Sequence, residues 1–497
     1  MISHKKLSLF SRLSYCNPFT AERFQIEKSL LGAKCKEVHE TWHIGMNRDG
    51  QRPNISVLVD FAEEALAEMR SLALAGKKFQ EEAYEDLISF YLYHSLNEAL
   101  EKAILEECLD KHKNNISQLY DEYLVKLRFY THIPGVKEYT EHDEAHLFAI
   151  FFQLRRAFHY IFNNIAGGSL QSTQLRSQIW NSIFTHDMRR YLQGRYSIMS
   201  EFSTMITGPS GTGKELVASA ICHSQYIPFD FKKKQFADYF KNLFIPVNLS
   251  AFPKQLIESE LFGHEKGSFT GALSNRVGWF ESCSPYGAVF LDEIGELSID
   301  IQVKLLRLLQ SRVFQRVGSS QDIKFSGKIL VATNRDLNEE MNKETFRSDL
   351  YYRLCSDRIV TPSLSEILAQ SPNELEEMVY YICQKVAPLE AESLSQETVK
   401  WVTESMSKSY SWPGNFRELE QCVRSVLIRK GYEPMQVDDY KEEDWLKMAA
   451  KANLTADELM SHYCKLAYEK YGNFGETAKK LKLDSRTVKA KIGTTDH

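Results

Sequence analysis

A glycine-rich loop constrains the fold of this chain more than any other feature. Residues 208–214 are Gly-Pro-Ser-Gly-Thr-Gly-Lys, and they lie between an apolar segment and a helical pattern. In such a loop the backbone N–H groups turn onto phosphate oxygens, and the N-terminus of the following helix adds positive potential. A chance glycine-rich turn is the alternative, which the strand before and the helix after disfavour. The sequence therefore predicts a phosphate-binding P-loop inside an α/β domain.

The residue types in this loop indicate how a nucleotide would be held. Lys214 can reach the β- and γ-phosphates. Glu215 stands where the general motif has Ser or Thr, so Mg²⁺ must be held mainly from elsewhere. The residues expected to bind the nucleotide are Gly208, Pro209, Ser210, Gly211, Thr212, Gly213, Lys214 and Glu215.

Short apolar segments alternate with helical patterns from about residue 200 onward. Long connections separate these segments, which is typical of a parallel sheet with crossover helices. The expected strands are Phe202–Thr207, Phe244–Val247, Ala288–Leu291, Ile329–Thr333 and Arg358–Thr361.

Two acids follow the third expected strand. Asp292 is expected to support Mg²⁺, directly or through water, and Glu293 to polarise the attacking water for in-line hydrolysis. Acid pairs at strand ends are common, but one that follows a phosphate loop in a parallel-sheet pattern is seldom idle.

The first part of the chain has a helical pattern. Apolar residues over 58–72 recur at i, i+3 and i+4, and residues 92–104 repeat this spacing. A third helix is expected to run from about Ala145 to Gly167-Gly168, because glycine readily adopts the left-handed conformation that ends a helix.

Residues 176–432 resemble the AAA+ ATPase domain of bacterial sigma-54-dependent transcriptional activators. The most specific segment is Glu-Ser-Glu-Leu-Phe-Gly-His-Glu-Lys-Gly-Ser-Phe-Thr-Gly-Ala at 258–272. The family carries a surface loop there, usually GAFTGA, that engages sigma-54, and here Ser268 takes the place of the first alanine. Read alone, this loop could be a plain turn, although an aromatic residue between glycines suits an exposed contact better than a core. The resemblance implies a sigma-54 contact formed by Gly267, Ser268, Phe269, Thr270, Gly271 and Ala272.

Further matching strings imply the rest of the catalytic machinery. By resemblance, Asn248 is the switch residue that holds the catalytic glutamate, and Thr333 with Asn334 is the γ-phosphate sensor. The resemblance also implies that Arg347 and Arg353 are the arginine fingers and that Arg417 is the lid sensor. An arginine from a neighbouring subunit neutralises charge that develops in phosphoryl transfer, so hydrolysis would require a ring, expected to be a hexamer. A single arginine is more often a solvated surface charge, but the matching strings favour the functional role.

Three features depart from the family pattern. Pro209 replaces the usual glutamate of the loop, and residues 361–367 lack an arginine-rich string. An extra stretch at 227–242, with three successive lysines, lengthens the connection before Asn248. The catalytic set remains complete, so an active ATPase is expected.

The end of the chain has helix-turn-helix spacing. Residues 453–492 form three expected helices, and either Asp484 or Ser485 can cap the last one. The segment 474–493 carries six Lys or Arg against two acids, and it is similar to the Fis-type domain that ends many of these activators. A solvated basic helix is the alternative, which the ATPase resemblance disfavours. The expected DNA contacts are Ser485, Arg486, Thr487, Lys489 and Lys491.

Two histidine pairs could hold a metal ion. His39 and His43 form an H-E-x-x-H string, and His142 and His146 repeat the spacing. Such pairs face one way on a helix and could bind zinc. Core packing or solvation is the favoured interpretation, since Gly45 truncates the helix that the first pair needs.

Composition limits the location and the partners of the chain. No apolar stretch approaches the length of a membrane helix, and the nine cysteines are odd in number and lack a C-x-x-C pair, as expected for reduced thiols of a cytoplasmic protein. The net charge of −5 means that DNA contact must come from a local patch. The expected domains are a helical regulatory domain at 1–175, an AAA+ α/β subdomain at 176–361, a helical lid at 362–432, a linker at 433–452 and a helix-turn-helix domain at 453–497.

The sequence thus predicts a transcriptional activator that uses ATP and Mg²⁺ in an oligomeric ring. It would bind upstream double-stranded DNA through its tail and open the promoter complex of sigma-54 RNA polymerase. Two alternatives stay open: a DNA-binding repressor in which the AAA+ fold is only a scaffold, and a AAA+ remodeller of another partner.

Overall fold

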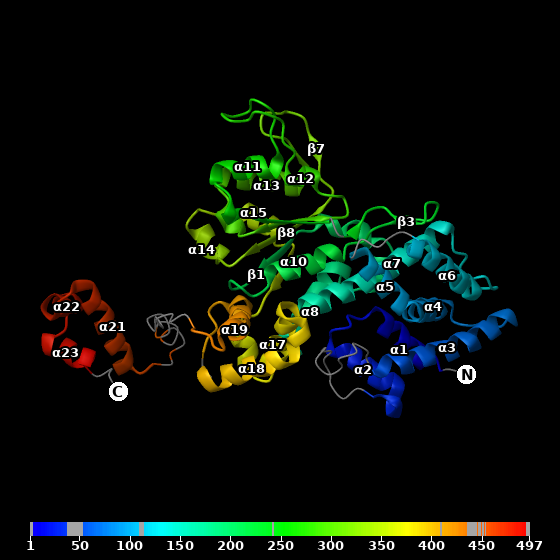
Figure 1. The fold of residues 1–497 in the computed structure, drawn as a ribbon, viewed down its shortest axis with the longest axis horizontal. Coiled ribbons are helices and arrows are strands. Elements are labelled where there is room, and N and C mark those ends of the chain that lie inside the picture. Colours follow the sequence, from blue (N-terminus) through cyan, green and yellow to red (C-terminus); the bar gives the residue numbers. More distant parts are fainter. Residues whose placement is uncertain are drawn as a thin grey trace. The chain divides into compact units, whose positions relative to one another are not determined.

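The computed structural model of the protein describes residues 3–36, 53–108, 114–240, 243–407, 410–434, 445, 449, 452 and 454–493. The chain divides into two compact units, Met1–Gly431 and Tyr432–His497. Each unit is described by itself, with the element labels of Figure 1.

A parallel five-stranded sheet forms the centre of the first unit. All neighbouring strands pair in parallel, which confirms the sheet type expected from the long connections. The strands lie in the order β4 (Phe244–Asn248), β5 (Ala288–Asp292), β8 (Lys328–Thr333), β1 (Thr204–Thr207) and β9 (Asp357–Val360). Each expected strand is confirmed, with its ends shifted by one or two residues.

Alternate residues along the strands enter two different cores, because successive side chains of a strand point to opposite faces. Phe290 and Leu330 belong to a buried cluster on one face, and Val289 and Val331 to a cluster on the other. The first cluster continues into the N-terminal helices, where it includes Phe148. The sheet and the N-terminal helical region therefore share one continuous hydrophobic core.

Helices cover both faces of the sheet (Figure 1). On the face of the first cluster, α10 (Lys214–His223) lies between the strands and the N-terminal helices. The opposite side carries α11 (Lys254–Phe262), α12 (Trp279–Ser282), α13 (Ile299–Ser311), α14 (Leu337–Asn342) and α15 (Ser348–Leu354).

The N-terminal region is helical, as expected. Its helices are α1 (His4–Tyr15), α2 (Ala21–Leu31), α3 (Pro53–Leu74), α4 (Glu81–Ser95), α5 (Asn97–Cys108), α6 (Asn114–Thr131), α7 (Glu141–Asn164), α8 (Leu170–Phe184) and α9 (Met188–Leu192). The expected single helix over 92–104 is wrong, because the chain breaks at Leu96 between α4 and α5. Ser95 precedes this break, and its Oγ donates to the Leu92 carbonyl at 3.0 Å, so the side chain competes with a helical backbone hydrogen bond.

The expected bounds of the third helix also differ from the structure. Helix α7 begins earlier, at Glu141, because Thr140 and Asp143 form a reciprocal capping box. It ends at Asn164. Gly167 has the expected positive φ of 89°, but it lies in the connection to α8.

The extra stretch before β4 forms a small hairpin, β2 (Phe229–Asp230) with β3 (Gln235–Phe236). The Phe229 ring lies 4.6 Å from that of Tyr120 and 4.9 Å from that of Phe148, between ring centroids. Lys234 Nζ donates to the Asp121 carboxylate at 2.6 Å. This departure from the family pattern therefore fastens the α/β part to α6 and α7.

Four helices form a lid after β9: α16 (Leu364–Gln370), α17 (Glu374–Val386), α18 (Ala391–Ser405) and α19 (Asn415–Arg429). Helix α17 packs against both α18 and α19. Helices α17, α18 and α19 therefore form one packed bundle.

The second unit contains the three helices expected at the end of the chain, α21 (Ala456–Tyr471), α22 (Phe474–Leu481) and α23 (Ser485–Gly493). Its core consists of Cys464, Ala478 and Val488, with Leu481 and Ile492 packed against it. Along the described part of the chain, we find no helix with the length and apolar character needed to cross a membrane.

Candidate nucleotide and partner sites

The glycine-rich loop leaves the end of β1 and leads into α10, as the sequence predicts. Gly211 and Gly213 have φ values of 77° and 85°, which only glycine adopts without strain. Lys214 is buried, and its Nζ donates to the carbonyl oxygens of Gly208 and Pro209, both at 3.0 Å. Burial lowers the pKa of Lys214, while the nearby charges of Glu293 and Asp292 act in the opposite direction. Glu215 and Pro209 are exposed.

Threonine side chains brace the loop against the end of β9. Thr212 Oγ1 donates to the Pro209 carbonyl at 2.8 Å and lies 2.7 Å from Thr361 Oγ1. A Cβ at Gly208 would lie 2.1 Å from Thr361 Oγ1. From the sequence, Thr361 is expected only at a strand end. Its contact with the loop arises because β1, which leads into the loop, pairs with β9, which leads to Thr361.

Asp292 is the last residue of β5 and Glu293 follows it, at the same edge of the sheet. Glu293 has a left-handed φ of 57°, and its N–H donates to Asp292 Oδ1 at 3.0 Å. The N–H of Asn334, which follows β8, lies 3.4 Å from Glu293 Oε2. The expected sensor residue and the expected catalytic glutamate are therefore neighbours.

Asn248 stands opposite Asp292 in the register of β4 and β5. Its Oδ1 accepts hydrogen bonds from the N–H of Ser250 at 3.0 Å and from Ser250 Oγ at 2.7 Å. In this arrangement the side chain is held by Ser250, so the switch role stays a prediction.

The two expected arginine fingers lie at the ends of α15. Arg347 precedes the helix and pairs with Asp349 at 2.8 Å, and this hydrogen bond raises the pKa of Arg347. Arg353 is exposed near the other end. Both arginines lie on the surface of the subunit, as a residue that acts on a neighbouring subunit must.

The N-terminus of lid helix α19 rests on the glycine-rich loop. Arg417 Nη1 lies 3.5 Å from Ser210 Oγ, and the N–H of Phe416 donates to the Gly211 carbonyl at 3.0 Å. Asn415, which is not among the expected site residues, joins the lid to the loop. Its Nδ2 donates to the Ser210 carbonyl and its Oδ1 accepts from the N–H of Leu364, both at 2.9 Å.

The close contact of loop and lid leads to a first prediction, on Gly211→Ala. The added Cβ would lie 2.2 Å from the Gly414 carbonyl oxygen, so α19 must move away from the loop. We expect a loss of about 1–3 kcal/mol of stability beyond the cost of the left-handed backbone, measured by thermal unfolding without nucleotide. Gly213→Ala is the matched control, because it carries similar backbone strain but its Cβ would meet only Leu216 Cδ1, at 3.6 Å. Equal shifts in Tm for the two variants would contradict this contact.

The expected sigma-54 loop is closed by its own backbone. The N–H of Gly267 donates to the Ala272 carbonyl at 2.9 Å, and that of Ala272 to the Phe269 carbonyl at 3.0 Å. Gly267 and Gly271 have positive φ values of 82° and 104°, which explains the two glycines. Phe269 is 39% exposed and Thr270 is exposed, whereas Ala272 is buried.

A second loop supports the first. It joins β6 (Val313–Phe314) to β7 (Ile323–Lys324), and both loops project from the sheet on the side of α11 (Figure 1). The N–H of Glu265 donates to the Val317 carbonyl at 3.0 Å. A Cβ at Gly318 would lie 2.5 Å from that of Ser268, so the second loop packs on the residue that replaces the usual alanine.

The basic residues of the tail differ in their exposure to solvent. Asp484 caps α23, since its Oδ1 accepts from the N–H of Arg486 at 2.8 Å. Ser485, Arg486, Thr487 and Lys489 are exposed. Lys491 is half-buried and forms an ion pair with Asp457 of α21, so it is turned towards its own domain.

The described histidine pair does not share a metal site. His146 Nδ1 lies 2.7 Å from Tyr226 Oη, and the His142 ring contacts that of Phe231. Within the described ranges, no group of three or more His, Cys, Asp or Glu has the arrangement of a metal site. His39 and His43 lie outside the described residues.

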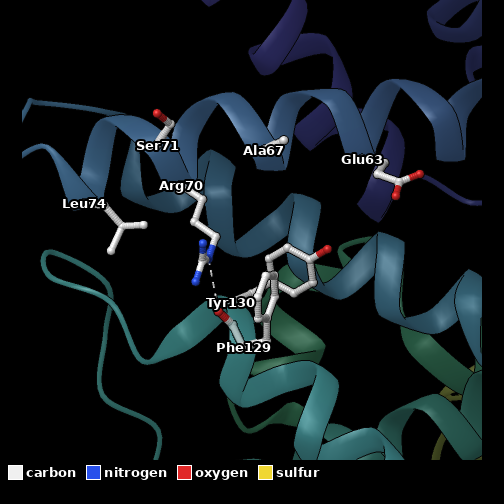
Figure 2. Close-up of a pocket in the computed structure, with 7 residues that line it drawn as sticks. All are labelled: Glu63, Ala67, Arg70, Ser71, Leu74, Phe129 and Tyr130. Atoms are coloured by element: carbon white, nitrogen blue, oxygen red, sulfur yellow. Dashed lines mark hydrogen bonds between the residues drawn. The ribbon is translucent and has the colours of Figure 1, made fainter.

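A cavity of about 430 Å³ lies between α3 and α6, away from the residues discussed above. Figure 2 shows Arg70 extending from α3 towards Phe129. Arg70 Nε donates to the Phe129 carbonyl at 3.3 Å, and the guanidinium lies 4.1 Å from the ring centroid. The cavity lining includes none of the described candidate site residues.

Several known proteins are similar in sequence to the part of the chain that carries these sites. Residues 185–360 match the family model of the Sigma-54 interaction domain. The Nif-specific regulatory protein of Azotobacter vinelandii is 42% identical over 248 residues, which are 49% of this chain and 43% of that protein. The Sigma54-dependent transcriptional activator SfnR of Pseudomonas putida is 39% identical over 244 residues, which are 49% of this chain and 61% of that protein.

A solved structure of NtrX from Brucella abortus in complex with ATP is 23% identical, covering 73% of this chain and 77% of that one with a TM-score of 0.40. The chain spans about half the length of the curated relatives it matches. The similarity therefore covers only a part of this chain and a part of each relative.

Proposed function

We propose that this protein is an ATP-hydrolysing transcriptional activator that opens the promoter complex of sigma-54 RNA polymerase, because residues 185–360 match the family model of the Sigma-54 interaction domain. The observation that carries the proposal is the joint presence, in one α/β domain, of the phosphate loop after β1, the Asp292-Glu293 pair at the end of β5 and a projecting Phe269-Thr270 tip. The expected nucleotide site and the expected partner contact thus lie in one compact unit.

The residues at the sheet edge divide the chemistry among them. Lys214 and the loop N–H groups would hold the phosphates of ATP. The carboxylate of Asp292 is a hard oxygen ligand that suits Mg²⁺, whose charge would neutralise the phosphates. Glu293 would orient and deprotonate the attacking water, and the Asn334 N–H at 3.4 Å from Glu293 Oε2 would report the γ-phosphate.

Hydrolysis in this proposal requires a ring, which we propose to be a hexamer. The half-exposed Arg347 and the exposed Arg353 would reach the nucleotide of the adjacent subunit and neutralise charge in the transition state. The Phe269-Thr270 tips of several subunits would then contact sigma-54 together. The ring would act in the cytoplasm, on DNA-bound polymerase.

The direct test combines two measurements on the full chain. ATP hydrolysis is followed by phosphate release, and promoter opening by strand reactivity with sigma-54 RNA polymerase, in the presence of ATP or a non-hydrolysable analogue. We expect turnover and opening with ATP only. Turnover no greater than that of a Lys214→Ala variant would overturn the proposal, and so would opening that does not depend on hydrolysis.

We also propose that the tail binds upstream DNA through α23, as a dimer of helix-turn-helix units. The second prediction concerns the exposed Arg486 and Lys489. Replacing both by alanine is expected to weaken DNA binding by about tenfold or more, since each lost phosphate or base contact costs about 1 kcal/mol. Fluorescence anisotropy at fixed salt measures this. Lys470→Ala, an exposed lysine of α21, is the control, and an equal loss in that variant would show that only overall charge matters.

A further inference from the structure

The end of α7 and the connection that follows it contact both α10 and the lid. We call residues 163–168 the bridge segment. Asn164 Nδ2 donates to the carbonyl of Leu216 at 3.2 Å, in the first turn of α10. The N–H of Gly168 donates to both carboxylate oxygens of Glu374, at 2.9 and 2.8 Å. Glu374 begins lid helix α17, and Tyr381 of the same helix donates to the Asn163 carbonyl.

Buried contacts hold the bridge segment in one conformation. Arg176 of α8 is fully buried and donates to the carbonyl oxygens of Ile165, at 3.0 Å, and Gly167. Burial lowers the pKa of Arg176 to about 10, so it stays charged at neutral pH. A Cβ at Gly167 would lie 2.4 Å from Glu374 Oε2. The glycine is therefore what lets the Glu374 carboxylate reach the amide of Gly168.

Helix α7 also contacts the C-terminal end of α10. Arg156 is fully buried, and it donates to the carbonyl oxygens of His223 at 2.9 Å and Gln225 at 2.6 Å, just past the last turn of α10. Gln153 donates to the Ser224 carbonyl at 2.9 Å. Since α7 contacts both ends of α10, the two helices form one antiparallel, rigid pair.

The lid is joined to this pair through Glu374. Helix α17 packs against α19, which carries Arg417 at 3.5 Å from Ser210. A change in the position of Glu374 would be passed to α19 through the packing of α17 on α19. The Gly168–Glu374 contact consists of a few polar groups, whereas α7 and α10 share hydrophobic packing, so a change between two lid positions would break the former and preserve the latter.

We propose that the bridge segment and Glu374 form a clasp that sets the position of the lid over the nucleotide, and that the N-terminal helices act on ATP binding through it. Glu374 is a positioning residue in this mechanism, acting through Arg417. The N-terminal helices share a core with α7, so a rearrangement among them reaches the bridge segment first. The inference rests on the proposed ATPase function.

The first test uses hydrogen exchange of the full wild-type chain with and without saturating ATPγS. Coupling between two sites is reciprocal, so nucleotide binding must alter the clasp if the clasp alters nucleotide binding. We expect slower exchange in a peptide covering residues 163–170, none of which belongs to the phosphate loop, together with slower exchange at 208–214. Protection at 208–214 alone would overturn the clasp. Absence of protection in both peptides would overturn the ATPase function, and the clasp with it.

The third prediction concerns Glu374→Ala in the full chain. We expect the KM for ATP to rise about fivefold with kcat changed less than about twofold, because only part of the energy of a charged hydrogen bond reaches the nucleotide. Glu374→Gln keeps one acceptor oxygen for Gly168 and is expected to fall between the wild type and the alanine variant. Glu376→Ala, an exposed acid in the same turn, is the matched control. An unchanged KM, or a lower kcat at the wild-type KM, would overturn the proposal.

Discussion

Replacing Glu293 by glutamine is expected to lower ATP hydrolysis by about 10²- to 10³-fold and to leave ATP binding intact. Glutamine keeps the size of the side chain and the oxygen that faces the N–H of Asn334, at 3.4 Å in the wild type, but it cannot take a proton from water. Binding depends mainly on Lys214 and the loop amides. Phosphate release gives the rate, and equilibrium titration with labelled nucleotide gives the affinity.

The matched control for this prediction is Glu296→Gln. Glu296 lies one turn further along the chain and forms an ion pair with Arg335, so it is an acid of the same neighbourhood with a partner of its own. Its replacement is expected to change hydrolysis by less than about threefold. A Glu293→Gln variant that keeps a tenth or more of the wild-type rate would assign the base to another group.

Replacing Thr270 by alanine is expected to reduce promoter opening by more than about tenfold, with ATP hydrolysis within about twofold of the wild type. Thr270 is exposed at a tip whose shape is set by backbone hydrogen bonds, such as the 2.9 Å bond from Gly267 to Ala272. The substitution therefore removes a partner contact and preserves the loop. Strand reactivity at the promoter is measured in parallel with phosphate release.

Ser274→Ala is the control for the tip, since Ser274 is exposed just outside the 267–272 loop. It is expected to open promoters like the wild type. Normal opening by the Thr270→Ala variant, with hydrolysis continuing, would mean that the loop does not pass force to sigma-54. The proposal of an activator would then fail even if the nucleotide site were verified.

The catalytic part of the fold was predictable because its signals are local. A strand followed by a glycine loop and a helix is encoded within about a dozen residues, as is the strand that ends in Asp292. The same holds for Gly267 and Gly271, whose left-handed backbone requires glycine. Helix ends were less predictable, because the break at Leu96 depends on small competing preferences of its neighbours.

The contacts between the parts of the chain were not predictable from any local pattern. Asn415 reaches the carbonyl of Ser210 across 205 positions, and Gly168 reaches Glu374 across 206. The sequence predicts only a helix end at Gly167-Gly168. In the structure, the absence of a side chain at Gly167 lets the Glu374 carboxylate reach the N–H of Gly168. The sequence of the hairpin at 229–236 does not indicate what it packs on, because its aromatic rings lie among those of α6 and α7, about 100 residues away in the chain.

The phosphate loop, the acid pair and the glycine-bounded tip can be expected from the sequence, since backbone strain and strand alternation act between near neighbours. The tertiary structure alone decided how the N-terminal helices are joined to the lid. That arrangement depends on which apolar faces share a core and which buried polar groups then find partners. Such matching is a property of the packed molecule and leaves no short-range mark in the chain.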